Sequence, residues 1–131
     1  MYYFLDVDGV LNKEADWDKP FTVNPDCLSC FRKLLSYDKH PFIVLSSTWR
    51  ANLDIISSYI TVEDVTPNTG GRKTRQEEIE YYIRRNNIQN YLILDDDESL
   101  FPEKEKIDIF FTDYKKGLTD SDVKQIVKKY L

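Results

Sequence analysis

The chain has 131 residues, a length typical of one domain with one hydrophobic core. Hydrophobic residues make up 41% and charged residues 31% of the chain, which argues against a disordered tail and against a membrane protein. The formal net charge of −5 excludes a broad basic face that grips long nucleic acid. We therefore expect a single domain over residues 1–131, soluble and cytoplasmic, with no membrane partner.

The N-terminal part of the chain predicts a strand, a loop and a helix. Residues 2–7 are short, apolar and rich in β-favouring side chains, as in a buried parallel strand. Residues 10–24 show no regular pattern and predict a loop or a short hairpin flap. Asn24 before Pro25 is a typical helix start, so we expect a helix over residues 25–37.

The middle of the chain repeats this alternation. Residues 41–46 predict a second buried strand, and apolar residues at helical spacing from Leu53 onward predict a second helix. Residues 61–73 contain a glycine pair and predict a loop with basic residues at its end. We expect a third helix around Ile79, where apolar residues again recur at helical spacing.

The C-terminal part predicts strands over 90–94 and 107–111 and a last helix over about 119–130, with Thr119 as its N-cap. Strands that alternate with helices predict an α/β, Rossmann-like parallel sheet with helices on both faces. In such sheets the functional groups gather at the carboxyl ends of the strands.

The excess of acidic residues lies in two short clusters, each directly after a predicted strand. Asp6 and Asp8 form the first cluster, and residues 95–97, all aspartates, form the second. Gly9 allows the chain to leave the first strand sharply. If the two clusters meet, their like charges need a cation such as Mg²⁺, which takes carboxylate and phosphate oxygens as ligands. The alternative is a plain turn at Asp8 with solvated acids.

Four stretches of the sequence resemble the motifs of the haloacid dehalogenase (HAD) superfamily of phosphohydrolases. They are Asp6–Asn12 with the pattern D-x-D-G-x-L, Val44–Ser46, the basic residue Lys73 before a helix, and Ile93–Asp96. The order and spacing of these stretches agree with those of the family's motifs, and the resemblance covers nearly the whole chain. The resemblance implies the HAD-like form of the Rossmann-like fold.

The resemblance also implies a role for each motif. Asp6 would be the nucleophile, and Asp8 the general acid and base. Ser46 would hold the transferred phosphoryl group, and Lys73 would help to cancel its charge. Mg²⁺ would be the cofactor, held by Asp6, Asp8 and the acidic pair Asp95 and Asp96.

A narrower resemblance concerns the small HAD domains of bacterial Swiss Army Knife RNA-repair proteins. It rests on the stretches Ser46–Arg50, Arg75–Ile79, Leu94–Asp97 and Gly117–Thr119. The intervals between the motifs are too short for a cap domain, so the chain is similar to the capless branch of the superfamily. Without a cap domain the crevice is open to large substrates. We therefore rank a phosphate at a polynucleotide end as the first candidate substrate, a phosphoprotein as the second and a small phosphate ester as the third.

Several assignments stay open in the sequence. Either Arg72 or Arg75 could serve the third motif in place of Lys73, because all three precede the same helix. Which carboxylate of residues 95–97 contacts the metal is also open, and Trp49 could be a core residue or a stacking surface. We expect substrate contacts from Ser47, Arg50, Arg72 and Arg75.

The sequence thus predicts a Mg²⁺-dependent phosphohydrolase that acts through an aspartyl-phosphate on a phosphorylated substrate. A phosphoacceptor signalling domain uses similar groups, but its acidic pair after the first strand is adjacent, whereas Asp6 and Asp8 are separated by one residue. A catalytically silent HAD-like binding module is a third reading. The sequence does not determine the oligomeric state, and a monomer is compatible with it.

Overall fold

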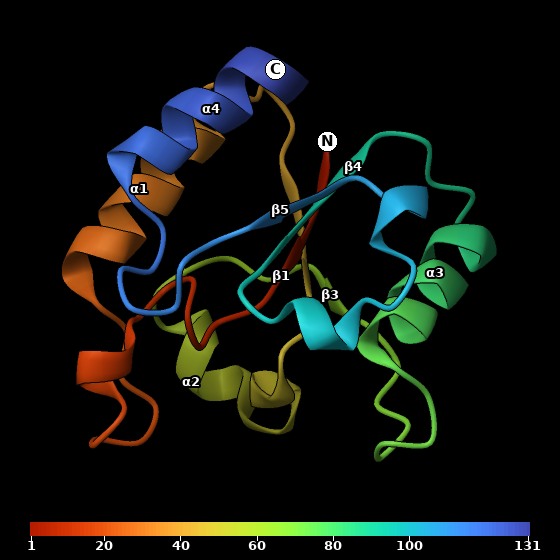
Figure 1. The fold of residues 1–131 in the computed structure, drawn as a ribbon, viewed down its shortest axis with the longest axis horizontal. Helices are drawn as coiled ribbons and strands as arrows, with labels where there is room; N and C mark the ends of the chain where they lie inside the picture. Colours follow the sequence, from red (N-terminus) through yellow and green to blue (C-terminus); the bar gives the residue numbers. More distant parts are fainter.

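The computed structural model describes residues 1–131 and contains a five-stranded parallel sheet (Figure 1). The strands are β1 (Tyr2–Leu5), β2 (Phe42–Leu45), β3 (Asp64–Val65), β4 (Tyr91–Asp95) and β5 (Ile109–Phe111). Their order across the sheet is β3-β2-β1-β4-β5, and each neighbouring pair is parallel. The predicted α/β, Rossmann-like fold without a cap domain is confirmed.

Three longer helices and one short helix connect or flank these strands. They are α1 (Pro25–Leu35), α2 (Leu53–Ser57), α3 (Arg75–Arg85) and α4 (Asp120–Tyr130). The side chains of Asn24, Thr74 and Thr119 cap the three longer helices, because each accepts hydrogen bonds from free backbone N–H groups of the first turn. No helix is both long enough and apolar enough to span a membrane.

Helices cover both faces of the sheet. In Figure 1, α1 and α4 lie side by side on one face, and α3 lies on the opposite side. Successive side chains of β1 point to opposite faces of the sheet. Tyr3 and Leu5 belong to the core cluster that contains residues of α1, α2 and α4. Phe4 instead packs with Ile79 and Tyr82 of α3. Burial on both faces explains why the strands are apolar throughout.

Three elements differ from the sequence-based expectation. The predicted loop 61–73 contains β3, a strand of only two residues that pairs with β2. The second helix is short and ends at Ser57, after a 3₁₀ turn over Thr48–Asn52. Of the two forms predicted for residues 10–24, the structure has the loop and no hairpin, and this loop contains an unexpected 3₁₀ turn, Glu14–Asp16.

The register of the central strands aligns their carboxyl ends. Leu5 of β1 pairs with Leu45 of β2 and with Leu94 of β4. The chain leaves β1 toward β2 on one side and returns to β4 on the other, so the connections diverge at β1. A crevice at this point of a parallel sheet is the usual place for a ligand.

Candidate active site

Three polar residues stand level with one another at the carboxyl ends of the central strands. Ser46, Asp6 and Asp95 each follow or end a strand, and the register of β2, β1 and β4 places them in one row. All three are buried. A crevice of about 740 Å³ opens here, and its lining includes Asp6, Asp8, Trp17, Arg75, Asp96 and Tyr114.

The acidic cluster that the sequence predicts is present. Oxygen atoms of Asp6, Asp95 and Asp96 all lie within 4.8 Å of one another. Burial, and next the charge of Asp95, raise the pKa of Asp6 well above its ordinary value. Burial also raises the pKa of Asp96 to about 6. The carboxylates therefore repel one another and resist full ionisation unless a cation joins them.

Arg75 is the one basic side chain among these carboxylates. As the first residue of α3, it donates from one terminal nitrogen to Asp6 Oδ1 at 3.2 Å and to Asp95 Oδ2 at 3.1 Å. Burial acts to lower the pKa of Arg75, but the two carboxylates outweigh burial and raise it above its ordinary value. One positive charge thus faces three carboxyl groups.

The structure separates Asp95 from Asp96. Both oxygens of Asp95 are engaged, because Oδ1 accepts the backbone N–H groups of Asp96 and Asp97 and Oδ2 accepts Arg75. Asp96 instead lines the open crevice. Asp97 caps the 3₁₀ turn that follows it. Asp97 lines the crevice too but lies outside the cluster, so within the cluster Asp96, and not Asp95, has an oxygen available to a metal ion or a substrate.

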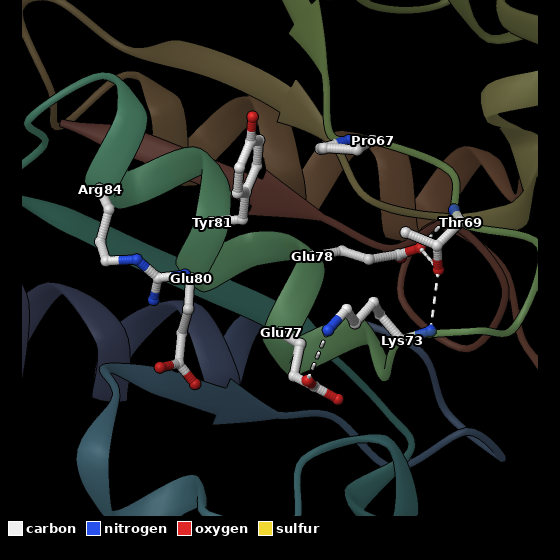
Figure 2. Close-up of a pocket in the computed structure, with 8 residues that line it drawn as sticks. All are labelled: Pro67, Thr69, Lys73, Glu77, Glu78, Glu80, Tyr81 and Arg84. Carbon is white, nitrogen blue, oxygen red and sulfur yellow. Dashed lines mark hydrogen bonds and ion pairs between the residues drawn. The ribbon is translucent and has the colours of Figure 1, made fainter.

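Lys73 does not lie in this site, contrary to the sequence-based choice of the basic residue. Its ammonium is 3.9 Å from Glu77 Oε2, and its side chain is 62% exposed. Figure 2 shows Lys73 beside Glu77 in a different pocket, of about 510 Å³, along α3. Arg72 is exposed as well and donates to the Thr69 carbonyl. The start of α3 directs only Arg75 toward the strand ends.

Gly9 and its neighbours bring Asp96 close to the first motif. Gly9 has a φ of +83°, and a Cβ atom there would overlap the Asp96 carboxylate. The Gly9 carbonyl accepts a hydrogen bond from Thr112 Oγ1 at 2.7 Å. The turn after β1 is therefore fixed in a shape that leaves room for the second acidic cluster.

Asp8 is held by two side chains that sequence reasoning did not assign to the site. Asn12 Nδ2 donates to Asp8 Oδ1 at 2.9 Å, and Trp49 Nε1 donates to Asp8 Oδ2 at 3.2 Å. Trp49 is buried, so it is no exposed stacking surface. Both donors fix the orientation of the Asp8 carboxylate.

Ser46 and Ser47 behave differently although they are adjacent. The Ser47 hydroxyl accepts the backbone N–H of Trp49 and caps the turn after β2. The Ser46 hydroxyl is fully buried and has no hydrogen-bond partner. A buried hydroxyl without a partner is costly, and it indicates a group prepared to bind a ligand oxygen.

Arg50 does not line the crevice. Its guanidinium pairs with Glu78 at 3.0 Å and also donates to Thr66 Oγ1 and to the Pro67 carbonyl. The ion pair is buried on both sides. The sequence-based expectation that Arg50 contacts substrate therefore disagrees with the structure, which places Arg50 in a closed ion pair that joins the β2 end to α3.

The residues present fit a divalent cation. Asp6 and Asp96 offer oxygen ligands, the preferred donors for Mg²⁺, and the single charge of Arg75 leaves the cluster negative. The unpartnered Ser46 hydroxyl lies in the row that contains Asp6. The arrangement can hold a metal ion and an oxyanion next to each other.

A comparison with protein families agrees with this geometry. The family model described as the HAD domain in Swiss Army Knife RNA repair proteins matches residues 2–123. The chain belongs to this family. The HAD superfamily consists mostly of hydrolases and phosphatases, so the family suggests a phosphohydrolase-type function for this domain. Searches of curated proteins and of solved structures find no match.

Proposed function

We propose that this HAD domain is a Mg²⁺-dependent phosphohydrolase that forms an aspartyl-phosphate on Asp6. One observation carries the proposal. A buried carboxylate, held at Oδ1 by Arg75, stands level with the unpartnered hydroxyl of Ser46. This arrangement supports a nucleophile, Asp6, and a binding group for a phosphoryl oxygen, Ser46, at the carboxyl ends of neighbouring strands.

The first step is an attack of Asp6 on phosphorus. Because Arg75 binds Oδ1, the other carboxylate oxygen of Asp6 remains for the attack. A bond forms between that oxygen and phosphorus, and the bond from phosphorus to the ester oxygen breaks. Protonated Asp8 gives its proton to the leaving oxygen, while the Ser46 hydroxyl and nearby backbone N–H groups hold the equatorial oxygens.

The second step hydrolyses the intermediate. Asp8, now ionised, takes a proton from water, and the water oxygen attacks phosphorus and releases Asp6. The donors from Asn12 and Trp49 hold the Asp8 carboxylate in a fixed orientation for this step. Mg²⁺ bound by Asp6, Asp96 and the Asp8 carbonyl would supply the charge that lets a carboxylate approach a phosphate dianion.

The substrate we propose is a phosphate at a polynucleotide end. The absence of a cap leaves the crevice open to a large molecule, and the matching family is named for domains of RNA repair proteins. Arg75 is the only basic residue in the crevice lining, whereas several acids line it. The site therefore suits one terminal phosphate rather than a long phosphodiester track.

Phosphate release with and without Mg²⁺ tests this function. The panel contains acetyl phosphate, phosphorylated oligonucleotides, phosphopeptides and mononucleotides. We expect Asp6→Asn to lose activity by on the order of 10³-fold or more, because an amide is no nucleophile. The matched control is Asp18→Asn, an exposed aspartate outside the crevice, which should keep full activity.

Other outcomes would replace the proposal. Near-normal turnover by Asp6→Asn on a true substrate would remove Asp6 from the mechanism. A phosphorylated form that persists well beyond seconds would indicate a phosphoacceptor signalling domain. No turnover and no phosphorylation on any member of the panel would indicate a silent binding module.

A further inference from the structure

Two exposed aromatic rings lie at the rim of the crevice and have no role in the proposed reaction. Trp17 is 43% exposed and Tyr114 is 39% exposed. Their rings are stacked, with centroids 5.9 Å apart and an angle of 22° between the planes. Both residues line the same crevice as Asp6 and Asp8. The two stacked rings therefore form an aromatic surface in the same crevice as the proposed reacting groups.

Trp17 is connected to the reacting groups through one buried side chain. Its indole N–H donates to Asn12 Oδ1 at 2.9 Å, and Asn12 Nδ2 donates to Asp8 Oδ1 at 2.9 Å. Asn12 also accepts the Gly9 N–H and donates to the Thr22 carbonyl, so its amide is fully bonded. The exposed ring of Trp17 is thus held in a fixed orientation relative to Asp8.

Tyr114 is anchored to the same part of the molecule. The Glu14 N–H donates to the Tyr114 carbonyl at 3.0 Å, and the Leu118 N–H donates to the Val10 carbonyl at 2.9 Å. The loop that carries Tyr114 is therefore fastened to the segment that follows Asp8. Preorganised aromatic surfaces lose little conformational freedom when they bind a flat ligand.

We propose that Trp17 and Tyr114 form a stacking surface for the nucleobase adjacent to the scissile phosphate. This inference rests on the proposed function, because the phosphate must bind at Asp6 for the base to reach the rim. Every nucleobase has a flat aromatic face that stacks on such side chains. The Lys115 ammonium lies 6.0 Å from the centre of the Tyr114 ring and adds a positive charge suited to a phosphodiester.

The polar groups of the crevice favour a nucleobase over the ring of a phosphotyrosine. Glu14 lines the crevice, and its carboxylate has no hydrogen-bond or ion-pair partner in the structure. Adenine, cytosine and guanine carry amino groups that donate hydrogen bonds to a carboxylate. The ring of phosphotyrosine offers no such donor, because its oxygen carries the phosphate.

A short RNA with a terminal phosphate tests the proposal. One version has a normal nucleotide at the phosphorylated end, and the other has an abasic nucleotide there. We expect the wild-type protein to prefer the normal end by about tenfold in kcat/KM, consistent with the typical strength of one base–aromatic stack. Tyr114→Leu should abolish this preference, and Tyr114→Phe should keep it.

Two controls separate this proposal from the proposed function. Tyr37→Leu removes another exposed tyrosine, outside the crevice, and should leave the preference unchanged. Acetyl phosphate has no ring, so its hydrolysis by the wild-type protein measures the phosphohydrolase reaction without any contribution from base stacking. If acetyl phosphate is hydrolysed and the two RNA ends react equally, the stacking surface is refuted and the phosphohydrolase stands.

Two further results would overturn the proposal in other ways. No turnover of acetyl phosphate or of either RNA would refute the proposed function, and the stacking surface with it. A preference for a phosphotyrosine peptide over a phosphoserine peptide that disappears in Tyr114→Leu, without any effect of the base, would assign the rim to protein substrates.

Discussion

Two buried arginines show how similar ion pairs serve different purposes in this domain. Arg50 faces one carboxylate, Glu78, and the same terminal nitrogen also donates to Thr66 Oγ1 and to the Pro67 carbonyl. Arg75 faces Asp6 and Asp95 at the edge of an open crevice, with Asp96 close by. Charge is balanced in the first region and unbalanced in the second. A closed pair stabilises the fold, whereas an excess of carboxylates needs a further cation.

The largest effect should come from breaking the balanced region. Arg50→Met leaves the buried Glu78 carboxylate without its counter-charge, and removal of one partner from a buried pair costs about 3–5 kcal/mol of unfolding free energy. Urea denaturation measures this loss. The double variant with Glu78→Leu should recover most of the stability, while a loss below about 1 kcal/mol in Arg50→Met would contradict a structural role.

The second effect concerns the unbalanced region. Arg75→Gln should lower kcat by about a hundredfold or more, because it removes the charge that holds Asp6 in place. Lys73→Gln is the matched control and should change kcat by less than about twofold, since Lys73 pairs only with exposed Glu77. A large loss of kcat in Lys73→Gln, with almost none in Arg75→Gln, would instead assign the basic residue of the third motif to Lys73.

The third effect is a dependence of stability on pH in the absence of metal. Because the pKa of Asp96 in the folded protein is about 6 and its ordinary value is 3.8, the folded state binds more protons than the unfolded state. This contribution to stability is full below about pH 4 and is lost as the pH rises through about 6. Asp96→Asn should therefore be more stable than the wild type at pH 7, but not at pH 4.

Thermal unfolding in a chelator, with Mg²⁺ added afterwards, measures this difference. Millimolar Mg²⁺ should raise the Tm of the wild type at pH 7 and should have a much smaller effect on Asp96→Asn, because the ion binds only the folded acidic cluster. Calorimetry that detects no binding of Mg²⁺ at millimolar concentration would rule out the metal site and the mechanism with it.

The smallest effect concerns the support of Asp8. Trp49→Phe keeps an aromatic ring at this position but removes the N–H that donates to Asp8 Oδ2. Loss of one such hydrogen bond corresponds to about a fivefold change in a rate constant. We expect kcat to fall by about that factor and the phosphorylated form to accumulate, because ionised Asp8 activates water. Rapid-quench analysis of labelled protein measures the accumulation. Unchanged kinetics would show that Asn12 alone orients Asp8.

Local patterns predicted most of the fold and the position of the site. Apolar runs that end in aspartate or serine indicated the carboxyl ends of β1, β2 and β4, and Asn24 and Thr119 marked true helix starts. Both kinds of signal depend on residues adjacent in sequence. The strand β3 was missed because two residues carry no periodicity, and it forms only through pairing with β2.

Side-chain contacts could not be predicted where they depend on residues far away in the chain. Arg50 and Glu78 are 28 positions apart, so the sequence gives no sign that they pair. Lys73 and Arg75 differ by two positions at a helix start, and only the packing of α3 decides which one points to Asp6. The contact of Trp49 with Asp8 spans 41 positions and was equally hidden.

Gly9 gives a simple criterion for judging which members of this family can form the acidic cluster. Any other residue there would need a strained backbone and would displace the Asp96 carboxylate from the space that a Cβ atom would fill. A relative could thus retain both aspartates of its first motif and still lack the cluster through this single replacement. Inspection of the position after the second aspartate would therefore distinguish relatives that can bring the two acidic segments together from those that cannot.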